Sequence, residues 1–253
     1  MTINVNNDYI VIMVPFGINM LGDLSMRILI VNPNTTESMT RKVEVVAKSV
    51  ARPDTEIIAT NPALGPLSIQ GYHDAAICVP HLLEVIKAHP QVDAIVIACF
   101  DDTGLDAARC AVDVPVVGIG ESAYHVASIL ANKFSVITTL GRSVPGLEAN
   151  LQRYGFDQRC VRVIATEIPV LKLEENDPAT LEKIKGAIRD TITDDMAEAI
   201  VLGCAGMTEL MEQLSDEFGL PVLDGVTCAV TLVEGLVAAN VKTSKIGGYA
   251  YPI

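Results

Sequence analysis

The stretches DAIVIACFDD (residues 93–102) and EAIVLGCAGM (residues 198–207) repeat one pattern within a single chain. In each, a run of apolar residues follows an acidic residue and ends on a cysteine, which is Cys99 in the first stretch and Cys204 in the second. A short, continuously apolar run is typical of a strand buried on both faces of a parallel sheet. We therefore expect two similar strands that end on cysteines at equivalent places in the fold.

Apolar runs on both sides of these stretches alternate with amphipathic segments of helical length. This alternation predicts the α/β class, with parallel sheets covered by helices on both faces. Since the pattern restarts near residue 134, we expect two similar lobes, each a four-stranded parallel sheet flanked by helices. A pseudo-twofold axis would relate them, with the active site between them. The expected strands are residues 27–32, 55–60, 93–99, 114–119, 134–139, 160–166, 198–204 and 220–225.

The repeat also suggests how the chain divides into domains. The first lobe is expected at residues 26–121, completed by residues 226–253, and the second lobe at residues 122–225. Residues 1–25 precede the regular pattern and are interpreted as an N-terminal extension. They contain no Lys or Arg, and therefore lack the basic start of a signal peptide.

Composition narrows the classes of function. The net charge of −13 opposes binding to nucleic acids and anionic membranes, and no apolar run is long enough to span a bilayer. The six cysteines show neither C-x-x-C nor zinc-ligand spacing, so we expect free thiols in a cytoplasmic protein and no metal site. The apolar character of the last helix suggests a homo-oligomer.

The two strand-end cysteines suggest a specific chemistry. Ligands of open parallel sheets bind beyond the carboxyl ends of the strands, where helix N-termini also favour a thiolate. If the lobes face each other, Cys99 and Cys204 flank one cleft. One thiolate then removes a proton from a carbon next to a carbonyl, and the other thiol returns a proton to the opposite face. The turn at Gly118–Gly120 and the residues after each cysteine are expected to supply N–H donors to the oxyanion.

The remaining candidate residues have simpler interpretations. Asp101 and Asp102 are expected to cap the helix after Cys99, and Asp102 is the carboxylate expected to raise the pKa of that thiol. Cys78, Cys110, Cys160 and Cys228 are expected to serve packing. Among the four histidines, only His73 is a candidate for a place near the cleft.

Several motifs resemble the Asp/Glu/hydantoin racemase superfamily, and most of all its hydantoin and allantoin racemases. The resemblance covers residues 26–253 and includes both cysteines with the family's separation. The motifs are VNPNTTESMT (31–40), GPLSIQGYHD (65–74), VIACFDDTGLDAAR (96–109), FSVITTLGRSVP (134–145), EIPVL (167–171), AIVLGCAGM (199–207), PVLDGV (221–226) and TSKIGGYAYP (243–252).

The resemblance implies a cofactor-independent racemase in which Cys99 and Cys204 are the acid–base pair. It also implies a small cyclic ureide as substrate, either a 5-substituted hydantoin or allantoin. Amino-acid racemases of the superfamily carry CNT and GCTE at the two cysteines, where this chain has CFDD and GCAGM and lacks those polar groups. The substrate contacts implied by position are Asn34, Phe100, Gly118, Gly120, Thr138, Thr139, Ala205 and Gly206.

Family members often have Gly-Asp-Pro after CF, whereas this chain has Asp101, Asp102 and Thr103. The preferred ring substituent is therefore open at this point. Other enzymes of the superfamily are alternatives, namely an amino-acid racemase, a maleate isomerase or an arylmalonate decarboxylase. A decarboxylase needs only one of the two cysteines. A non-catalytic small-molecule binding module is the alternative from another class, and it would bind a ligand without exchanging its protons.

Overall fold

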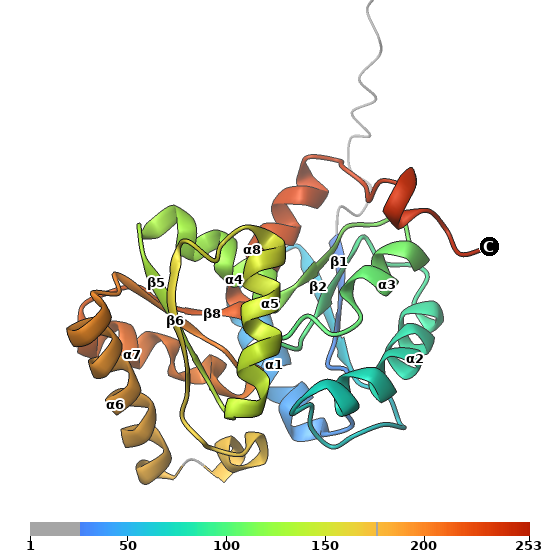
Figure 1. Cartoon of the computed structure of the whole chain (residues 1–253). Helices are drawn as coiled ribbons and strands as arrows, with labels where there is room; N and C mark the ends of the chain where they lie inside the picture. The colour runs from blue at the N-terminus through green and yellow to red at the C-terminus, as the bar shows by residue number, and fades with distance from the viewer. Residues whose placement is uncertain (1–25, 176) are drawn as a thin grey trace, which may run out of the picture.

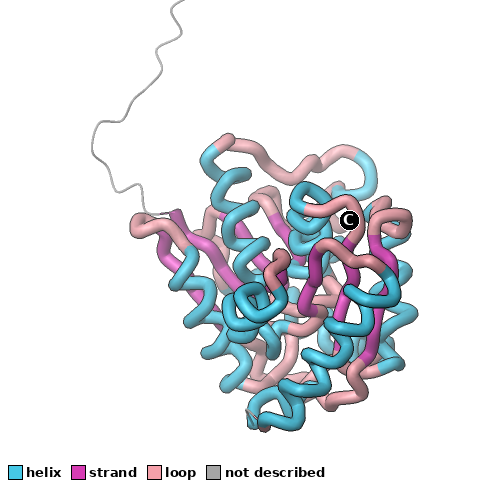
Figure 2. Tube along the Cα trace, turned by 90° about the vertical axis from the view of Figure 1, so that its left-hand side faces the viewer, coloured by secondary structure: helices cyan, strands magenta, loops and turns pink. Residues whose placement is uncertain are grey.

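The computed structural model describes residues 26–175 and 177–253, except for the side chain of residue 174. The expected N-terminal extension lies outside the described residues. Two parallel sheets, each flanked by helices, lie side by side in the molecule (Figure 1). Turned by 90°, the strands are seen between layers of helices (Figure 2). This arrangement confirms the predicted α/β class with two four-stranded sheets.

The first sheet has the strand order β2-β1-β3-β4, and every neighbouring pair is parallel. Its central strand β3 is buried along its whole length, as its uninterrupted apolar sequence predicts. Its strands are β1 (Met26–Val31), β2 (Thr55–Thr60), β3 (Ala94–Ile97) and β4 (Val116–Gly118), and its helices are α1 (Glu37–Val50), α2 (Tyr72–Ala88), α3 (Leu105–Ala111) and α4 (Ile119–Leu130).

The second sheet repeats this topology with the order β6-β5-β7-β8, again all parallel, which confirms the duplication predicted from the sequence. Its strands are β5 (Phe134–Thr138), β6 (Cys160–Ala165), β7 (Ala199–Leu202) and β8 (Val222–Asp224). Its helices are α5 (Val144–Tyr154), α6 (Pro178–Asp195), α7 (Met211–Phe218) and α8 (Gly225–Ala238), with 3₁₀ helices η1 (Gly141–Ser143), η2 (Val170–Glu175), η3 (Ala205–Leu210) and η4 (Gly247–Tyr249).

Local sequence explains where several helices begin and end. Asp177 caps α6 by accepting the N–H of Ala179 at 3.0 Å, one residue before the proline that opens the helix. Gly155 ends α5 in the left-handed conformation with φ of 80°, as its sequence position predicts. The segment between Cys204 and β8 begins with the 3₁₀ helix η3 and continues as the α-helix α7.

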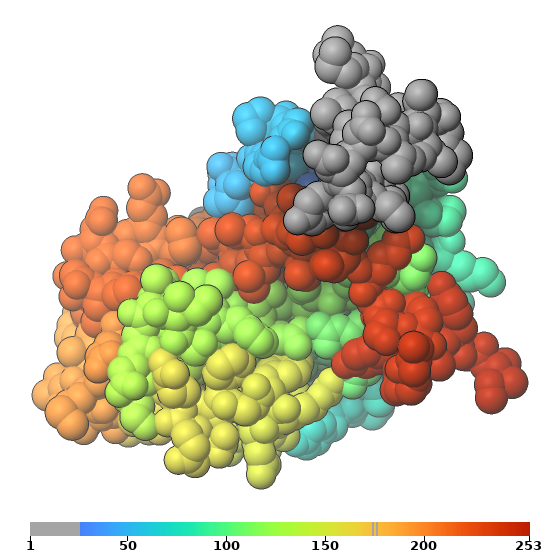
Figure 3. Space-filling model, turned by 90° about the horizontal axis from the view of Figure 1, so that it is seen from above, coloured from blue at the N-terminus to red at the C-terminus, as the bar shows by residue number. Residues whose placement is uncertain are grey.

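Helices α4 and α8 join the two halves. α8 packs against β3 and β4 of the first sheet, whereas α4 packs against β7 and β8 of the second, and the two helices pack against each other. Seen from above, α8 in red lies beside the green segment that contains α4 (Figure 3). Buried Tyr124 of α4 and Val230 of α8 belong to one apolar core with residues of both sheets, so the halves share a continuous core.

The apolar character of α8 was the reason for expecting an oligomer, and the structure gives it another explanation. The apolar residues Val226, Ala229, Val230 and Val233 are all fully buried within the chain itself. Burial inside one molecule therefore accounts for the hydrophobicity of this helix. Within the described residues, no helix is both long and apolar enough to cross a membrane.

Candidate active site

Cys99 and Cys204 occupy equivalent positions in the two halves. Each cysteine lies two residues beyond the third strand of its half, since β3 ends at Ile97 and β7 at Leu202. In the observed strand orders, β1 and β3 are central neighbours in one sheet, and β5 and β7 in the other. The chain passes from β1 to β2 on one side of the first sheet and from β3 to β4 on the other side, and the second sheet does the same. Open α/β sheets bind ligands at the point between two central strands where the direction of the connections reverses in this way, called a switch point. Both cysteines therefore lie at switch points.

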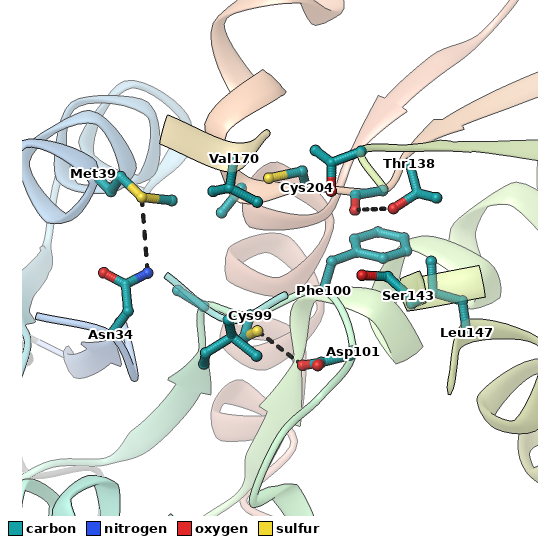
Figure 4. Close-up of a pocket in the computed structure, with 15 residues that line it drawn as sticks. Asn34, Met39, Cys99, Phe100, Asp101, Thr138, Ser143, Leu147, Val170 and Cys204 are labelled. Atoms are coloured by element: carbon teal, nitrogen blue, oxygen red, sulfur yellow. Dashed lines mark hydrogen bonds between the residues drawn. The ribbon is translucent and has the colours of Figure 1, made fainter. Parts of the chain in front are cut away.

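Both thiols line one cavity between the halves. The close-up shows Cys99 and Asp101 on one side of this cavity and Cys204 and Val170 on the other (Figure 4). The space between its lining residues, counted with the open mouth, is about 480 Å³. The lining residues are Asn34, Met39, Ile69, Ala98, Cys99, Phe100, Asp101, Thr138, Thr139, Ser143, Leu147, Val170, Gly203, Cys204 and Ala205.

The half-buried Cys99 is held in its protonated form. Its sulfur donates to Asp101 Oδ1 at 2.8 Å (Figure 4). Burial raises the pKa of the Cys99 thiol well above its ordinary value, and the charge of Asp101 and this hydrogen bond raise it further. The helix N-terminus was expected to lower that pKa toward neutrality, and for Cys99 this expectation is wrong. Loss of hydration and a nearby negative charge outweigh the helix dipole.

Cys204 has a different environment. It is the N-cap residue of η3, and its sulfur accepts the N–H of Gly206 at 3.4 Å. A backbone N–H directed at sulfur favours the negatively charged form of that atom. The two thiols are thus related by topology, and each makes a hydrogen bond to a group two residues further along the chain. Cys99 donates to a carboxylate, and Cys204 accepts from the backbone.

Asp102 has another role than the one expected for it. The carboxylate that touches Cys99 belongs to Asp101, whereas Asp102 turns away from the cavity in the left-handed conformation with φ of 53°. Its buried carboxylate accepts N–H groups from Gly120 at 2.9 Å and Glu121 at 2.8 Å, and therefore caps α4 instead of α3. Tyr154 donates a third hydrogen bond at 2.9 Å. Burial still raises the pKa of Asp102 to about 7, against the effect of these donors.

Gly118 and Gly120 were expected at a substrate-binding turn, and the structure places them elsewhere. Gly118 ends β4, Gly120 lies in the first turn of α4, and neither lines the cavity. The N–H of Gly120 is already bonded to Asp102 and is no donor for an oxyanion. A Cβ atom on Gly118 would lie 2.0 Å from Asp102 Oδ1, and one on Gly120 would lie 2.2 Å from the carbonyl oxygen of Phe100. Close packing against the Asp102 loop accounts for both glycines.

Asn34 lines the cavity from the loop after β1. Its side-chain oxygen accepts Asn32 Nδ2 at 3.0 Å and the N–H of Thr36 at 2.9 Å. Its Nδ2 makes only a weak contact of 3.8 Å, to the sulfur of Met39, and both side chains face the cavity (Figure 4). With its oxygen occupied, Asn34 presents an amide donor to a ligand.

Thr138 and Thr139 line the cavity from the end of β5, the strand of the second half that is equivalent to β1. The Thr138 hydroxyl donates to the carbonyl oxygen of Gly203 at 3.2 Å, which leaves its oxygen as an acceptor. Within the described part of the chain, no side-chain partner is found for the Thr139 hydroxyl. Both residues are nearly fully buried, so an unpaired polar atom here is available to a ligand.

Three further predicted contacts lie beside the cysteines. Phe100 lines the cavity, and its buried ring packs edge-to-face on Tyr124 with centroids 5.5 Å apart. Ala205 lines the cavity as well. Gly206 is not part of the lining, and it reaches the site through its N–H bond to Cys204.

Sequence reasoning missed several residues of the cavity wall. Ser143 lies inside the motif FSVITTLGRSVP, Leu147 follows two residues after that motif, and Val170 comes from the motif EIPVL. Loop residues after a parallel strand are expected near the ligand, so the place of Ser143 in the β5–α5 connection was a usable signal. Met39 and Ile69 lie inside the motifs VNPNTTESMT and GPLSIQGYHD, but their own side chains are apolar and gave no further signal.

His73, the only histidine considered for the cleft, has a side chain that is 80% exposed and does not line the cavity. Among the described residues, no group of three or more His, Cys, Asp and Glu side chains is arranged to hold a metal ion.

Known proteins share this sequence and architecture. The family model described as Asp/Glu/Hydantoin racemase matches residues 28–233. The hydantoin racemase of Rhizobium meliloti is 47% identical over 230 residues, which cover 90% of this chain and 95% of that protein. The hydantoin racemase of Pseudomonas sp. (strain NS671) is 44% identical, with 90% and 92% covered.

A solved structure shows the same relationship in three dimensions. The allantoin racemase from Klebsiella pneumoniae has a TM-score of 0.88 and 43% sequence identity, with 90% of this chain and 94% of that chain covered. The family model spans most of the chain, and the relatives match nearly their whole length. The chain therefore belongs to the Asp/Glu/hydantoin racemase family and is an isomerase of the racemase type.

Proposed function

We propose that this enzyme racemises 5-substituted hydantoins or allantoin with Cys99 and Cys204 as its two bases. One cysteine, as the thiolate, removes the proton from C5 of the ring and becomes a thiol. The other cysteine, as the thiol, gives its proton to the opposite face of C5 and becomes a thiolate. No atom is gained or lost, and the reverse reaction uses the same groups with exchanged roles.

The observation that carries this proposal is the placement of two thiols on opposite sides of one small cavity. A single base would exchange a proton and return it to the same face. Two bases from duplicated strand ends allow the proton to return from the other side. Because β3 and β7 are equivalent strands, the duplication itself supplies the approximate symmetry that a reversible inversion requires.

The cavity wall favours a neutral ring over an amino acid or a dicarboxylate. Its described lining residues include no Lys, Arg or His that could pair with a substrate carboxylate. Phe100, Leu147 and Val170 provide apolar surface for a flat ring or its substituent. A dianion such as maleate would enter without a compensating cation, which is costly in a partly buried site. This argument disfavours the amino-acid racemase and maleate isomerase alternatives.

The enolate formed at C5 needs a donor for its oxygen. The Asn34 amide nitrogen faces the cavity while the Asn34 oxygen is held by Asn32 and Thr36. We assign it the role of hydrogen-bond donor to the ring carbonyl next to C5. Thr138 and Thr139 are assigned to the ring N–H groups, since their hydroxyl oxygens are acceptors.

The proposal is tested by incubating one enantiomer of 5-benzylhydantoin, and separately one enantiomer of allantoin, with the enzyme in D2O. Circular dichroism follows optical activity, and proton NMR follows the C5 signal. Loss of optical activity together with deuterium at C5, faster than without enzyme, is expected for at least one of the two compounds. Binding without exchange would overturn the proposal and leave the binding-module alternative. The ratio of the two rates identifies the preferred ureide.

A further inference from the structure

Asp101 brings a carboxylate to the cavity that the two-cysteine reaction does not require. Three donors meet at its Oδ1, namely the Cys99 thiol at 2.8 Å, the Thr103 N–H at 3.2 Å and the Thr103 hydroxyl at 2.5 Å. In the described part of the chain, its Oδ2 accepts no hydrogen bond. One carboxylate oxygen therefore holds the local structure together, and the other is available to the contents of the cavity.

The carboxylate of Asp101 has no cation at ion-pair distance among the residues that the structure describes. The described residues form no ion pair with it, and none of the other residues lining the cavity is a cation or a second carboxylate. Cys99, which faces it, is a thiol and does not neutralise it. Among the described residues of the cavity wall, Asp101 therefore presents a substrate with a negative charge that no lining cation offsets.

Hydrogen bonds hold the backbone of Asp101 and the residue that follows it. The carbonyl oxygen of Asp101 accepts Asn150 Nδ2 of α5 at 2.8 Å. The next residue, Asp102, is tied to Gly120, Glu121 and Tyr154. With the backbone fixed on both sides, the charge cannot leave the cavity wall without breaking this network.

We propose that Asp101 is a specificity-determining residue that excludes substrates with an anionic C5 substituent and favours neutral, hydrogen-bond-donating or cationic ones. This inference rests on the proposed racemisation of cyclic ureides and specifies their class. A carboxylate on the substituent would lie within several ångströms of Asp101, where like charges in a partly buried site repel strongly. An amide, ureido or ammonium group in the same place would donate to Oδ2. The expected discrimination is about tenfold or more in kcat/KM.

The test compares three hydantoins that differ mainly in charge, with 2-carboxyethyl, 2-carbamoylethyl or 3-aminopropyl at C5. For the natural enzyme, kcat/KM for the carbamoylethyl compound should exceed that for the carboxyethyl compound by about tenfold or more. Asp101→Asn should bring this ratio to within about threefold, mainly through a lower KM for the anionic compound. Asp101→Glu should restore discrimination. Asp106→Asn, which removes a charge outside the cavity wall, should leave the ratio unchanged.

A second measurement tests the cavity charge without any substrate. Iodoacetamide is neutral and iodoacetate is anionic, and both alkylate a thiolate with loss of iodide. Because both reagents react with the same thiolate, the ratio of their rates at one cysteine does not depend on the pKa of that thiol. Peptide mass spectrometry at Cys204 should show this ratio shifting by about tenfold toward iodoacetate in Asp101→Asn, but not in Asp106→Asn.

The two measurements separate the possible failures. If the enzyme racemises neutral hydantoins and neither ratio changes in Asp101→Asn, the specificity role is overturned while the proposed function stands. If no cyclic ureide is racemised but the alkylation ratio shifts, the proposed function fails while the anion-excluding role of Asp101 is supported. An unchanged alkylation ratio overturns the role of Asp101 whatever the substrate.

Discussion

The Tyr154 hydroxyl donates to the buried carboxylate of Asp102 at 2.9 Å, although the two residues belong to different halves of the molecule. Tyr154 ends α5, which follows β5, and Asp102 lies in the loop between β3 and α3. Asn150, one turn earlier on α5, donates to the carbonyl oxygen of Asp101. A helix of the second half therefore positions the loop that carries Cys99. This link ties the loop that carries Cys99 to the half of the molecule that carries Cys204.

The first prediction concerns the separate roles of the two thiols. Cys99→Ser and Cys204→Ser should each lower kcat for racemisation by about 10²–10⁴-fold, because a serine hydroxyl is a far weaker acid than a thiol. Each variant should still exchange the C5 proton of one enantiomer with retention, through the remaining cysteine. NMR in D2O with each pure enantiomer shows which face each thiol serves.

Cys110→Ser is the matched control for these variants, since Cys110 is half-buried, lies outside the cavity wall and donates to the carbonyl oxygen of Gly248. Its activity should remain near that of the natural enzyme. Full racemisation by either Cys99→Ser or Cys204→Ser would contradict a two-base reaction.

The second prediction concerns the pH dependence of activity. Asp101 raises the pKa of Cys99 through its charge and its hydrogen bond, in addition to the effect of burial. Asp101→Asn removes the contribution of the charge, so less alkaline conditions should suffice to form the Cys99 thiolate. The rising limb of kcat/KM should therefore move to lower pH for the enantiomer that Cys99 deprotonates.

The enantiomer deprotonated by Cys204 serves as the internal reference, because both profiles come from one protein. Its rising limb should move less than that of the other enantiomer. Equal shifts for both enantiomers, or a shift to higher pH, would show that Asp101 does not act on Cys99 in this way.

The third prediction concerns stability and Asp102. Its pKa is about 7 in the folded protein and about 4 in an unfolded chain. Between these two pH values, the folded protein keeps a proton on Asp102 that the unfolded chain has lost. The contribution of Asp102 to the free energy of unfolding therefore falls as the pH rises toward 7, and it is constant at higher pH. Between pH 5 and pH 8, this group should lower the free energy of unfolding by about 2–3 kcal/mol. Urea unfolding at both values measures it.

Asp102→Asn has no titrating group at this position, and it isolates the effect from all other ionisations. The difference in free energy of unfolding between the natural enzyme and Asp102→Asn should change with pH by the amount given above. Parallel pH dependences of the two proteins would refute the assignment.

The fourth prediction concerns the contact between α4 and α8. A Cβ atom on Gly225 would lie 2.5 Å from the carbonyl oxygen of Ile119, at the point where the two helix starts meet. Since backbone cannot yield as a flexible side chain does, Gly225→Ala should cost about 3 kcal/mol of stability. Gly235→Ala lies in the same helix with open space around it and should stabilise by roughly 0.5–1 kcal/mol. Chemical denaturation of both variants provides the comparison.

Much of the architecture was predictable because it follows from local pattern. Uninterrupted apolar runs such as residues 94–97 and 199–202 must be buried on both faces, and only parallel sheets covered by helices achieve this. The repeated order of strand, cysteine and helix then predicts that Cys99 and Cys204 lie beyond equivalent strand ends. That both line one cavity agrees with this expectation.

The environment of each thiol was not predictable in the same way. Asp101 and Asp102 are identical neighbours in sequence, yet one touches Cys99 and the other caps α4. A left-handed backbone at Asp102 turns its side chain toward Gly120, Glu121 and Tyr154, which lie 18 to 52 residues away in the chain. Periodicity of apolar residues contains no information about such distant partners.

The sequence by itself determined the α/β class, the duplicated halves and the equivalent placement of two cysteines, because burial of apolar runs depends on spacing along the chain. Only the tertiary structure decided that Gly118 and Gly120 pack against Asp102, and that Asp101 holds the proton of Cys99. The first outcome depends on contacts between the Asp102 loop and the start of α4, and the second on the conformation of that loop, which Asn150 and Tyr154 hold from the other half.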